Sequence, residues 1–265
     1  MTWIQVIVLA VVQGLTEFLP ISSSGHLVLV PSVLGWTDQG LVFDVAVHFG
    51  SLGAVCVYFR NDIVAVLRGS VSVATGHTKS PESRMAIAIA IGTVPAALAG
   101  LLFAGWISDN LRHPSVVVGT LAGFGIVLAL ADRFGKRQRI IADVGIRDAI
   151  VIGLAQALAL IPGTSRSGVT ISAALMLGFQ RRDAARFSFL LSAPVILLAT
   201  LYETAVLIAG GGSVAWSTLG VAALVSGVVA YLSIEFFMRF VTAIGLLPFA
   251  VYRLVLAAVI VFVLF

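Results

Sequence analysis

Long apolar runs separated by short polar connections dominate the chain. Three runs contain no charged residue, and three more contain only one or two ionisable groups. Each run is close to the roughly 20 residues that a helix needs to cross the hydrocarbon core of a bilayer. The pattern therefore predicts six transmembrane helices, over Leu41–Phe59, Met85–Gly105, Pro114–Ala131, Ala184–Ala209, Val214–Ile234 and Gly245–Phe265.

Two further apolar segments, residues 2–34 and 146–179, are interrupted near the middle by proline, glycine and serine. The interruptions read FLPISSSGH and IPGTSRSG. The apolar arms on either side are shorter than the roughly 17 to 25 residues of a spanning helix. Irregular backbone at membrane depth occurs only where it is buried in protein or lines a water-filled cavity. We therefore predict two re-entrant helical hairpins, with a functional site at their breaks.

The two interrupted segments also resemble each other at a constant offset of 143 residues. The matched pairs are Gln13 with Gln156, Leu15 with Leu158, Ser22 with Ser165, Ser24 with Ser167, and Gly25 with Gly168. We expect one membrane domain, 1–265, made of two repeats. The first, 1–132, has hairpin 2–34 and three spans, and the second, 146–265, has hairpin 146–179 and three spans. Because three is odd, the second repeat is inverted in the membrane. The predicted fold class is an all-α polytopic membrane protein with inverted-topology repeats.

Composition and charge agree with this prediction. Hydrophobic residues make up 60% of the chain and charged residues 11%, whereas a soluble domain carries about a quarter charged residues. The net charge of +4 does not indicate nucleic-acid binding, because the basic residues lie in short loops. All but three of the 16 Lys and Arg residues lie in the loops 60–84, 132–147, 179–186 and 238–245. The positive-inside rule makes these loops cytoplasmic. Both termini and the active-site opening then face outward, on the side that also carries Arg112.

The first break contains a carboxylate within an apolar segment. Gln13 and Glu17 are four residues apart, so they share one face of a helical arm. An acid at membrane depth is costly and indicates a function, although a structural carboxylate is the alternative. His26 and the serines Ser22, Ser23 and Ser24 follow. The hydroxyls could instead serve only to satisfy freed backbone groups, and His26 could be an ordinary turn residue.

The second break places Arg166 among hydroxyl-bearing residues. These residues are Thr164, Ser165, Ser167 and Thr170. A guanidinium flanked by hydroxyls and by the start of a helix suits the oxygens of a phosphate. We expect folding of the two halves to bring this group opposite Glu17 and His26, which together would supply what phosphoryl transfer needs.

Two other groups of ionisable residues have a structural interpretation. Asp44 and His48 share one face near the end of a predicted span, and we favour a structural role for them over a supporting role at the site. Arg253, in the middle of the last span, is expected to pair with an acid or with the backbone of a hairpin.

Both breaks resemble motifs of the undecaprenyl-diphosphate phosphatase family, also called the bacitracin-resistance family. The similar stretches are QGLTEFLPISSSGH, PGTSRSGVT, FSFLLSAP at 187–194 and PFAVYR at 248–253. The resemblance implies removal of the terminal phosphate from undecaprenyl diphosphate, a polyprenyl diphosphate of the bacterial plasma membrane. This reaction recycles the carrier lipid for peptidoglycan synthesis and gives bacitracin resistance.

The resemblance also implies roles for individual residues. Glu17, with Gln13, would hold a divalent metal cation, either Mg²⁺ or Ca²⁺. His26 would act as a base or a proton relay, Arg166 would hold the diphosphate, and Ser23 and Ser165 would be nucleophiles or phosphate contacts. Many family members have Glu where this chain has Gln13, so one metal-binding carboxylate is missing.

Several alternatives stay open on the sequence alone. The attacking group is a serine, a histidine or a metal-activated water. A lipid-phosphate transporter or flippase would use the same inverted-repeat site. A homodimer is also open.

Overall fold

The structure, a computed structural model, describes residues 1–111, 113–209 and 215–264. Arg112 and the predicted span ends Val214 and Phe265 therefore lie outside the described residues. Within the described ranges the chain is helical throughout, without a β-strand. The first half forms α1 (Trp3–Thr16), α2 (Ser23–Leu34), α3 (Leu41–Tyr58), α4 (Arg60–Ala74), α5 (Pro81–Asn110) and α6 (Pro114–Phe134). The second half forms a 3₁₀ turn (Ile141–Asp143), α7 (Ile146–Leu158), α8 (Arg166–Met176), α9 (Arg181–Ala209), α10 (Trp216–Ile244) and α11 (Leu247–Leu264).

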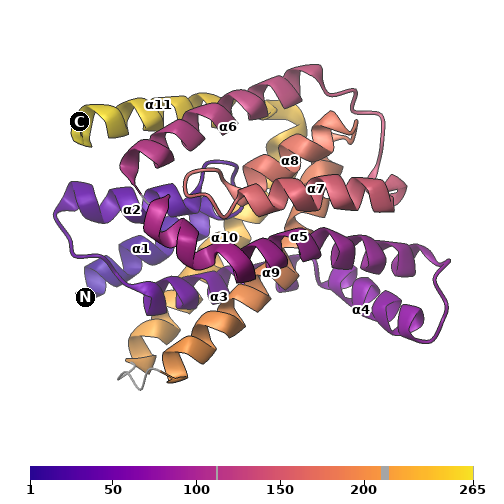
Figure 1. Ribbon diagram of the computed structural model, residues 1–265, viewed down its shortest axis with the longest axis horizontal. Coiled ribbons are helices and arrows are strands. Elements are labelled where there is room, and N and C mark those ends of the chain that lie inside the picture. The colour runs from indigo at the N-terminus through magenta and orange to yellow at the C-terminus, as the bar shows by residue number, and fades with distance from the viewer. Residues whose placement is uncertain (112, 210–214, 265) are drawn as a thin grey trace.

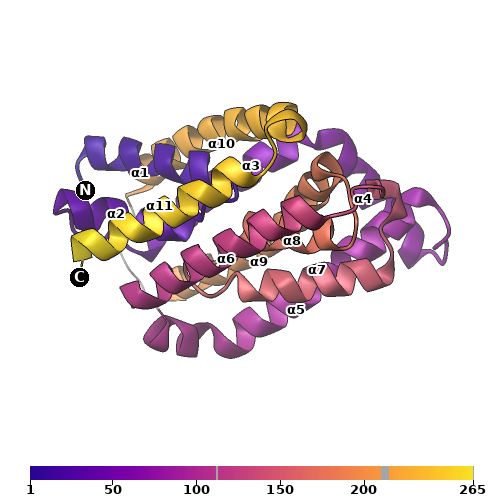
Figure 2. The same ribbon diagram turned by 90° about the horizontal axis from the view of Figure 1, so that it is seen from above.

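The long helices lie side by side in one bundle (Figures 1 and 2). Among the described residues, four stretches of helix are long and apolar enough to cross a membrane, namely Pro81–Phe103, Pro114–Phe134, Arg181–Leu207 and Trp216–Ile244. The α3–α4 pair would be a fifth span if it is counted as one unit, and α11 is a shorter apolar helix. The prediction of an all-α multi-pass membrane protein is confirmed. The count of six spans and two re-entrant hairpins stays a prediction.

The prediction of a loop over 60–84 is wrong for the first part of this segment, which forms α4. The chain bends by 88° between α3 and α4, and α4 then packs against α5. Gly69 allows this approach, since a Cβ there would lie 2.2 Å from the carbonyl oxygen of Glu82. The basic residues of the segment suggested a loop, yet apolar residues recur between them at helical spacing, as at Ile63 and Val66.

Each hairpin has the same backbone shape at its break. Ser22 and Ser165 both adopt positive φ angles, of 75° and 70°, which few residues other than glycine adopt. Both serines cap the helix that follows, accepting a hydrogen bond from the amide of the glycine three residues later. Both also contact the hydroxyl of the serine two residues later, at 3.3 Å. The repeated Ser-x-Ser-Gly sequence therefore specifies one local structure twice.

Each hairpin packs against a helix of the other half of the chain. α1 lies against α10, and α7 lies against α5. Glycine permits both contacts, because a Cβ on Gly14 would lie 2.6 Å from the Ser226 carbonyl oxygen. A Cβ on Gly153 would likewise lie 2.5 Å from the carbonyl oxygen of Gly92. This reciprocal packing brings the two breaks together in the middle of the bundle. The inversion of the repeats relative to a bilayer stays a prediction.

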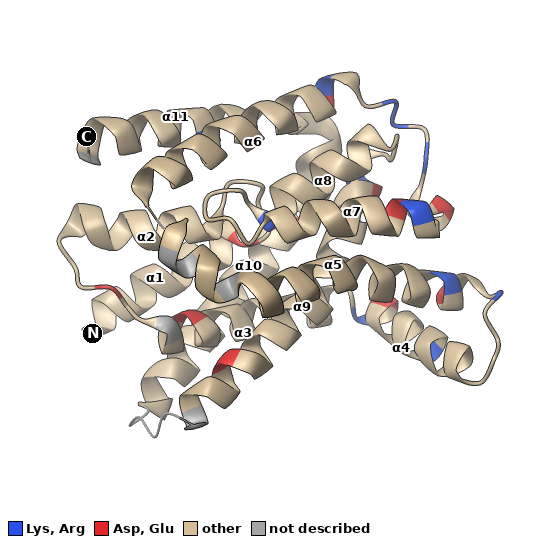
Figure 3. Ribbon diagram, in the orientation of Figure 1, with Lys and Arg blue, Asp and Glu red and all other residues tan. Residues whose placement is uncertain are grey.

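Charge is distributed unevenly along the bundle. Lys and Arg gather where α4 meets α5 and where α6 is linked to α7, and both termini lie at the opposite end (Figure 3). At the basic end, Arg139 donates two hydrogen bonds to the carboxylate of Asp148, at 2.8 and 2.6 Å. Hydrogen bonding to Asp148 raises the pKa of Arg139 above its ordinary value. At the basic end an ion pair thus joins the α6–α7 connection to α7.

Candidate active site

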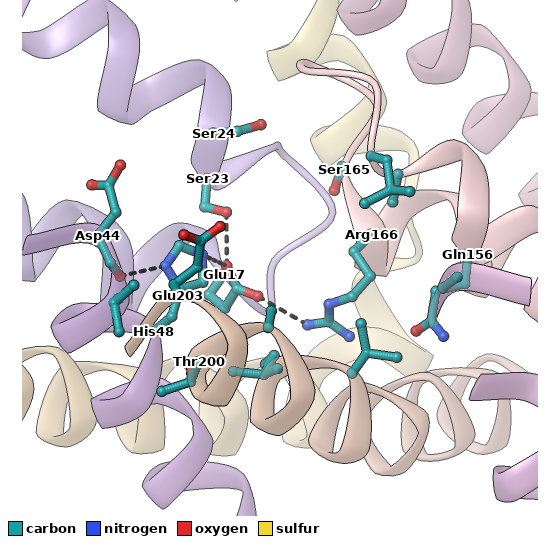
Figure 4. A pocket seen from close by; sticks show the side chains of 17 residues that line it. Glu17, Ser23, Ser24, Asp44, His48, Gln156, Ser165, Arg166, Thr200 and Glu203 are labelled. Carbon is teal, nitrogen blue, oxygen red and sulfur yellow. Dashed lines mark hydrogen bonds and ion pairs between the residues drawn. The ribbon is translucent and has the colours of Figure 1, made fainter. Parts of the chain in front are cut away.

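The two breaks line one cavity of about 330 Å³. Its walls come from both hairpins and from α3, α5 and α9. The first hairpin contributes Glu17, Ser23 and Ser24, and the second contributes Gln156, Ser165 and Arg166 (Figure 4). The expectation that the two breaks meet is confirmed by this shared cavity.

A buried ion pair joins the two hairpins across the cavity. Glu17 Oε1 lies 3.2 Å from Arg166 Nη2. The other carboxylate oxygen, Glu17 Oε2, accepts hydrogen bonds from Gln13 Nε2 at 2.9 Å and from Ser23 Oγ at 2.7 Å. Arg166 also lies over the ring of Phe18, at 5.7 Å from its centroid. Because both charges are largely buried, their electrostatic interaction is screened less than it would be in water.

The imidazole of His48 stands beside Glu17. His48 Nε2 lies 3.6 Å from Glu17 Oε2, and His48 Nδ1 donates to the carbonyl oxygen of Asp44 at 2.7 Å. Asp44, His48 and Glu203 line the same end of the cavity (Figure 4). The sequence predicts a structural role for His48, whereas the structure places the side chain in the cavity wall. The signal for a place at the site was an ionisable pair, four residues apart, inside an apolar run.

His26 does not face Glu17, so the expected Glu17–His26 cluster is not formed. Its Nδ1 bonds to the carbonyl oxygen of Ser22 and its Nε2 to the hydroxyl of Tyr252, both at 2.7 Å. The ring also stacks on Tyr252 of α11, with centroids 5.7 Å apart. These contacts hold His26 between the first break and α11, outside the lining of the cavity. Its proposed role as a base stays a prediction.

The remaining predicted residues are buried within the breaks. Ser167 donates to the carbonyl oxygen of Leu19 at 3.0 Å, linking the two hairpins. Thr170 donates to the carbonyl oxygen of Arg166 at 2.7 Å and contacts the Ser188 hydroxyl. Thr164 Oγ1 is buried without a hydrogen-bond partner among the described residues. Ser22, Ser167 and Thr170 thus bond to backbone groups of the breaks, which is the structural alternative expected from the sequence for such hydroxyls.

Arg253 fixes the backbone of the second break from α11. The side chain is fully buried, and its Nη2 donates to the carbonyl oxygens of Gly163 at 3.0 Å and Thr164 at 2.9 Å. It also donates to the carbonyl oxygens of Thr120 and Leu121 on α6. Of the two partners expected from the sequence, the hairpin backbone is therefore the one observed.

Comparison with known proteins identifies the family of this chain. A model of the family described as bacitracin resistance protein BacA matches residues 6–259. This chain belongs to that family. It is 53% identical over 258 residues to the undecaprenyl-diphosphatase of Hahella chejuensis, with 97% of each chain covered. It is 50% identical over 262 residues to that of Alcanivorax borkumensis, with 99% of each covered. It is 49% identical over 265 residues to that of Alteromonas mediterranea, with 100% of each covered.

The oxygen atoms around Glu17 are the candidate metal ligands. In the part of the chain that the structure describes, no group of three or more His, Cys, Asp or Glu side chains could hold a metal ion. Magnesium, however, is usually bound by one or two carboxylates together with substrate phosphates. Gln13 Oε1 is buried and has no hydrogen-bond partner among the described residues. Glu17 and the Gln13 amide therefore fit a cation that is shared with a bound phosphate.

Proposed function

We propose that this chain hydrolyses undecaprenyl diphosphate to undecaprenyl phosphate and inorganic phosphate, as the names of its relatives state for them. The observation that carries the proposal is the meeting of Glu17, Ser23 and Arg166 in one cavity of a membrane protein. These residues supply an acid–base group, a hydroxyl and a cation. In a bacterial membrane the reaction would recycle the carrier lipid of cell-wall synthesis.

Arg166 would bind the diphosphate. Its Nη2 contacts Glu17, and its Nη1 makes only a long contact of 3.4 Å with the Ser188 carbonyl oxygen. Its Nε is buried without a partner among the described residues. A guanidinium with free donors can receive a phosphate without first breaking strong bonds. Arg166 is also the first residue of α8, where the helix dipole favours an anion.

Ser23 would attack the terminal phosphorus, with Glu17 accepting the hydroxyl proton. The geometry that supports this step is the 2.7 Å hydrogen bond from Ser23 Oγ to Glu17 Oε2. Attack would form a bond between Ser23 Oγ and phosphorus and break the bond to the bridging oxygen, so that undecaprenyl phosphate leaves. Water would then hydrolyse the phosphoserine, returning the proton from Glu17 to the hydroxyl.

A divalent cation, Mg²⁺ or Ca²⁺, would be held by Glu17 and by the Gln13 amide oxygen. When bound, it would neutralise charge on the diphosphate oxygens. Gln13 already contacts Glu17 at 2.9 Å, so a rotation of its side-chain amide would turn the oxygen toward a cation held by Glu17.

We also propose that the basic end of the bundle faces the cytoplasm. Both termini lie at the other end (Figure 3), so they would face outward. The polar end of the cavity, with Asp44 and Glu203, would open to the same side. A lipid diphosphate in the outer leaflet could then reach the site with its headgroup.

The direct test is phosphate release by the purified protein in detergent micelles. Without two compartments, transport gives no signal, so release of inorganic phosphate from undecaprenyl diphosphate reports hydrolysis alone. We expect multiple turnovers by the wild-type protein. Binding of the lipid without release of phosphate would reject the phosphatase and favour a transporter.

A further inference from the structure

The internal repeat places residues of opposite character at equivalent positions of the site. At the offset of 143 residues, Glu17 corresponds to Leu160. Both residues line the same cavity. At these equivalent positions the first repeat therefore contributes a charged side chain to the cavity and the second repeat an apolar one. The site is not symmetric for this reason.

The lining of the cavity changes from polar to apolar along α9. Thr200 and Glu203 lie at the end where Asp44 and His48 are found (Figure 4). Val195 and Ile196, up to two helical turns earlier, line the cavity with apolar groups. An amphiphile such as a prenyl diphosphate binds with the most favourable free energy when its apolar chain lies against the apolar wall. The cavity is thus built to receive its substrate in one direction.

Gln156 lines the cavity on the side of Arg166 away from Glu17 (Figure 4). Its side chain is 1% exposed, yet its Oε1 has no hydrogen-bond partner among the described residues. Its Nε2 makes only a 3.4 Å contact with the carbonyl oxygen of Gly92. The repeat-equivalent Gln13 is by contrast held at 2.9 Å by Glu17. A buried amide that lacks strong hydrogen-bond partners lowers the stability of the protein, and a bound ligand can supply those partners.

Arg166 presents a free donor in the same region. Its Nε is also buried without a partner in the described part of the chain. A rotation of the Gln156 side chain that turns its NH₂ group toward the guanidinium breaks only the long contact with Gly92. The amide NH₂ and the guanidinium could then donate to the oxygens of one phosphate.

We propose that Gln156 binds the lipid-linked phosphate of the substrate, with the first isoprene unit against Leu160. This inference rests on the proposed function. The terminal phosphate is then directed toward Glu17 and Ser23, and Arg166 contacts both phosphates from the centre. Gln156 fixes the direction of the diphosphate, so that hydrolysis releases inorganic phosphate at the Glu17 end and leaves the lipid phosphate at the Gln156 end.

The experiment measures inhibition of the purified enzyme by its two products. Undecaprenyl phosphate would occupy the Gln156 end, and inorganic phosphate would occupy the Glu17 end. In Gln156→Leu, we expect the KM for undecaprenyl diphosphate and the inhibition constant of undecaprenyl phosphate to rise in parallel. The rise should be about tenfold or more, as for the loss of a hydrogen bond to a charged group. The inhibition constant of inorganic phosphate should change by less than about threefold, and so should kcat. On the same scale this is a small change in free energy.

Two further variants make the result decisive. Gln156→Glu keeps the size of the side chain and adds a negative charge, so it should weaken inhibition by undecaprenyl phosphate more than Gln156→Leu does. Gln138→Leu is the matched control, because Gln138 is exposed in the α6–α7 connection, and it should behave as the wild type. Monodisperse elution and an unchanged thermal midpoint establish that each variant is folded.

The outcomes separate this inference from the proposed function. If the wild type releases no phosphate, the proposed function fails first. If the wild type is active but both Gln156 variants leave inhibition by undecaprenyl phosphate unchanged, Gln156 does not bind the lipid-linked phosphate. A selective loss of inhibition by inorganic phosphate would show that the substrate binds in the reverse direction.

Discussion

Glu17 and Arg166 lie 149 positions apart in the chain, yet their charged groups approach to 3.2 Å in the centre of the bundle. The contact forms because each hairpin packs on a helix of the opposite half. Removal of one partner of a buried ion pair leaves the other unpaired, which costs about 3–5 kcal/mol. Substitutions at this pair therefore affect stability as well as turnover, so both must be measured.

The first prediction separates the serines of the first break. Ser23→Ala should lower phosphate release by at least about 100-fold, because it removes the hydroxyl that donates to Glu17. Ser24 lines the cavity but only accepts a 3.4 Å hydrogen bond from the Gly163 amide and contacts Ser22. Ser24→Ala should keep turnover within about tenfold, the loss of one weak hydrogen bond. Full activity of Ser23→Ala would favour a water molecule as the attacking group.

The second prediction concerns the metal. Treatment of the purified protein with EDTA should stop phosphate release, and excess Mg²⁺ or Ca²⁺ should restore it, because one carboxylate with an amide oxygen binds such ions through shared phosphates. In Gln13→Leu the concentration of cation that gives half-maximal activity should rise. Undiminished turnover in EDTA would remove the cation from the proposed mechanism.

The third prediction tests the helix contact that supports the first hairpin. A Cβ on Gly50 of α3 would lie 2.0 Å from the Ala223 carbonyl oxygen on α10. Gly50→Ala should therefore destabilise the protein by about 1–3 kcal/mol, the usual cost of overpacking, and lower its thermal midpoint. Gly53, one turn later, has nothing within 4 Å of its Cβ position. Gly53→Ala is the matched control, and equal midpoints of the two variants would argue against close contact of α3 with α10.

The fourth prediction concerns orientation in the membrane. Single cysteines at Trp3 and at Lys79, which are both exposed and lie at opposite ends of the bundle, would be introduced into a Cys56→Ala background. A membrane-impermeant maleimide applied to intact spheroplasts should label the cysteine at position 3 and not that at position 79, as the positive-inside rule requires. The reverse pattern of labelling would invert the proposed topology.

Much of the site could be predicted because its local structure is encoded locally. The Ser-x-Ser-Gly sequence occurs twice and produces the same positive φ angle at Ser22 and Ser165. A carboxylate and a guanidinium placed in such breaks have few stable partners at membrane depth other than each other. The meeting of Glu17 and Arg166 followed from these two facts and from the repeat.

Other features depend on how helices rotate against one another, which no local pattern reveals. His48 faces Glu17 only because of the orientation of α3, and His26 turns toward Tyr252 because α11 lies beside the first break. The helix α4 was missed because its basic residues indicated a loop. Gln156 becomes a candidate ligand-binding residue only in the structure, where its amide oxygen lies in the cavity wall without a hydrogen-bond partner among the described residues.

The most direct test of the account is phosphate release from undecaprenyl diphosphate by Arg166→Ala, compared with Arg133→Ala. Arg133 is an exposed arginine at the end of α6, so its loss controls for a change in net charge. We predict that Arg166→Ala retains less than about 1% of wild-type turnover, because the cation that holds the diphosphate contributes at least about 3 kcal/mol. Arg133→Ala should retain nearly all of it. Wild-type turnover by a folded Arg166→Ala protein would contradict the claim that the two breaks form one phosphatase site.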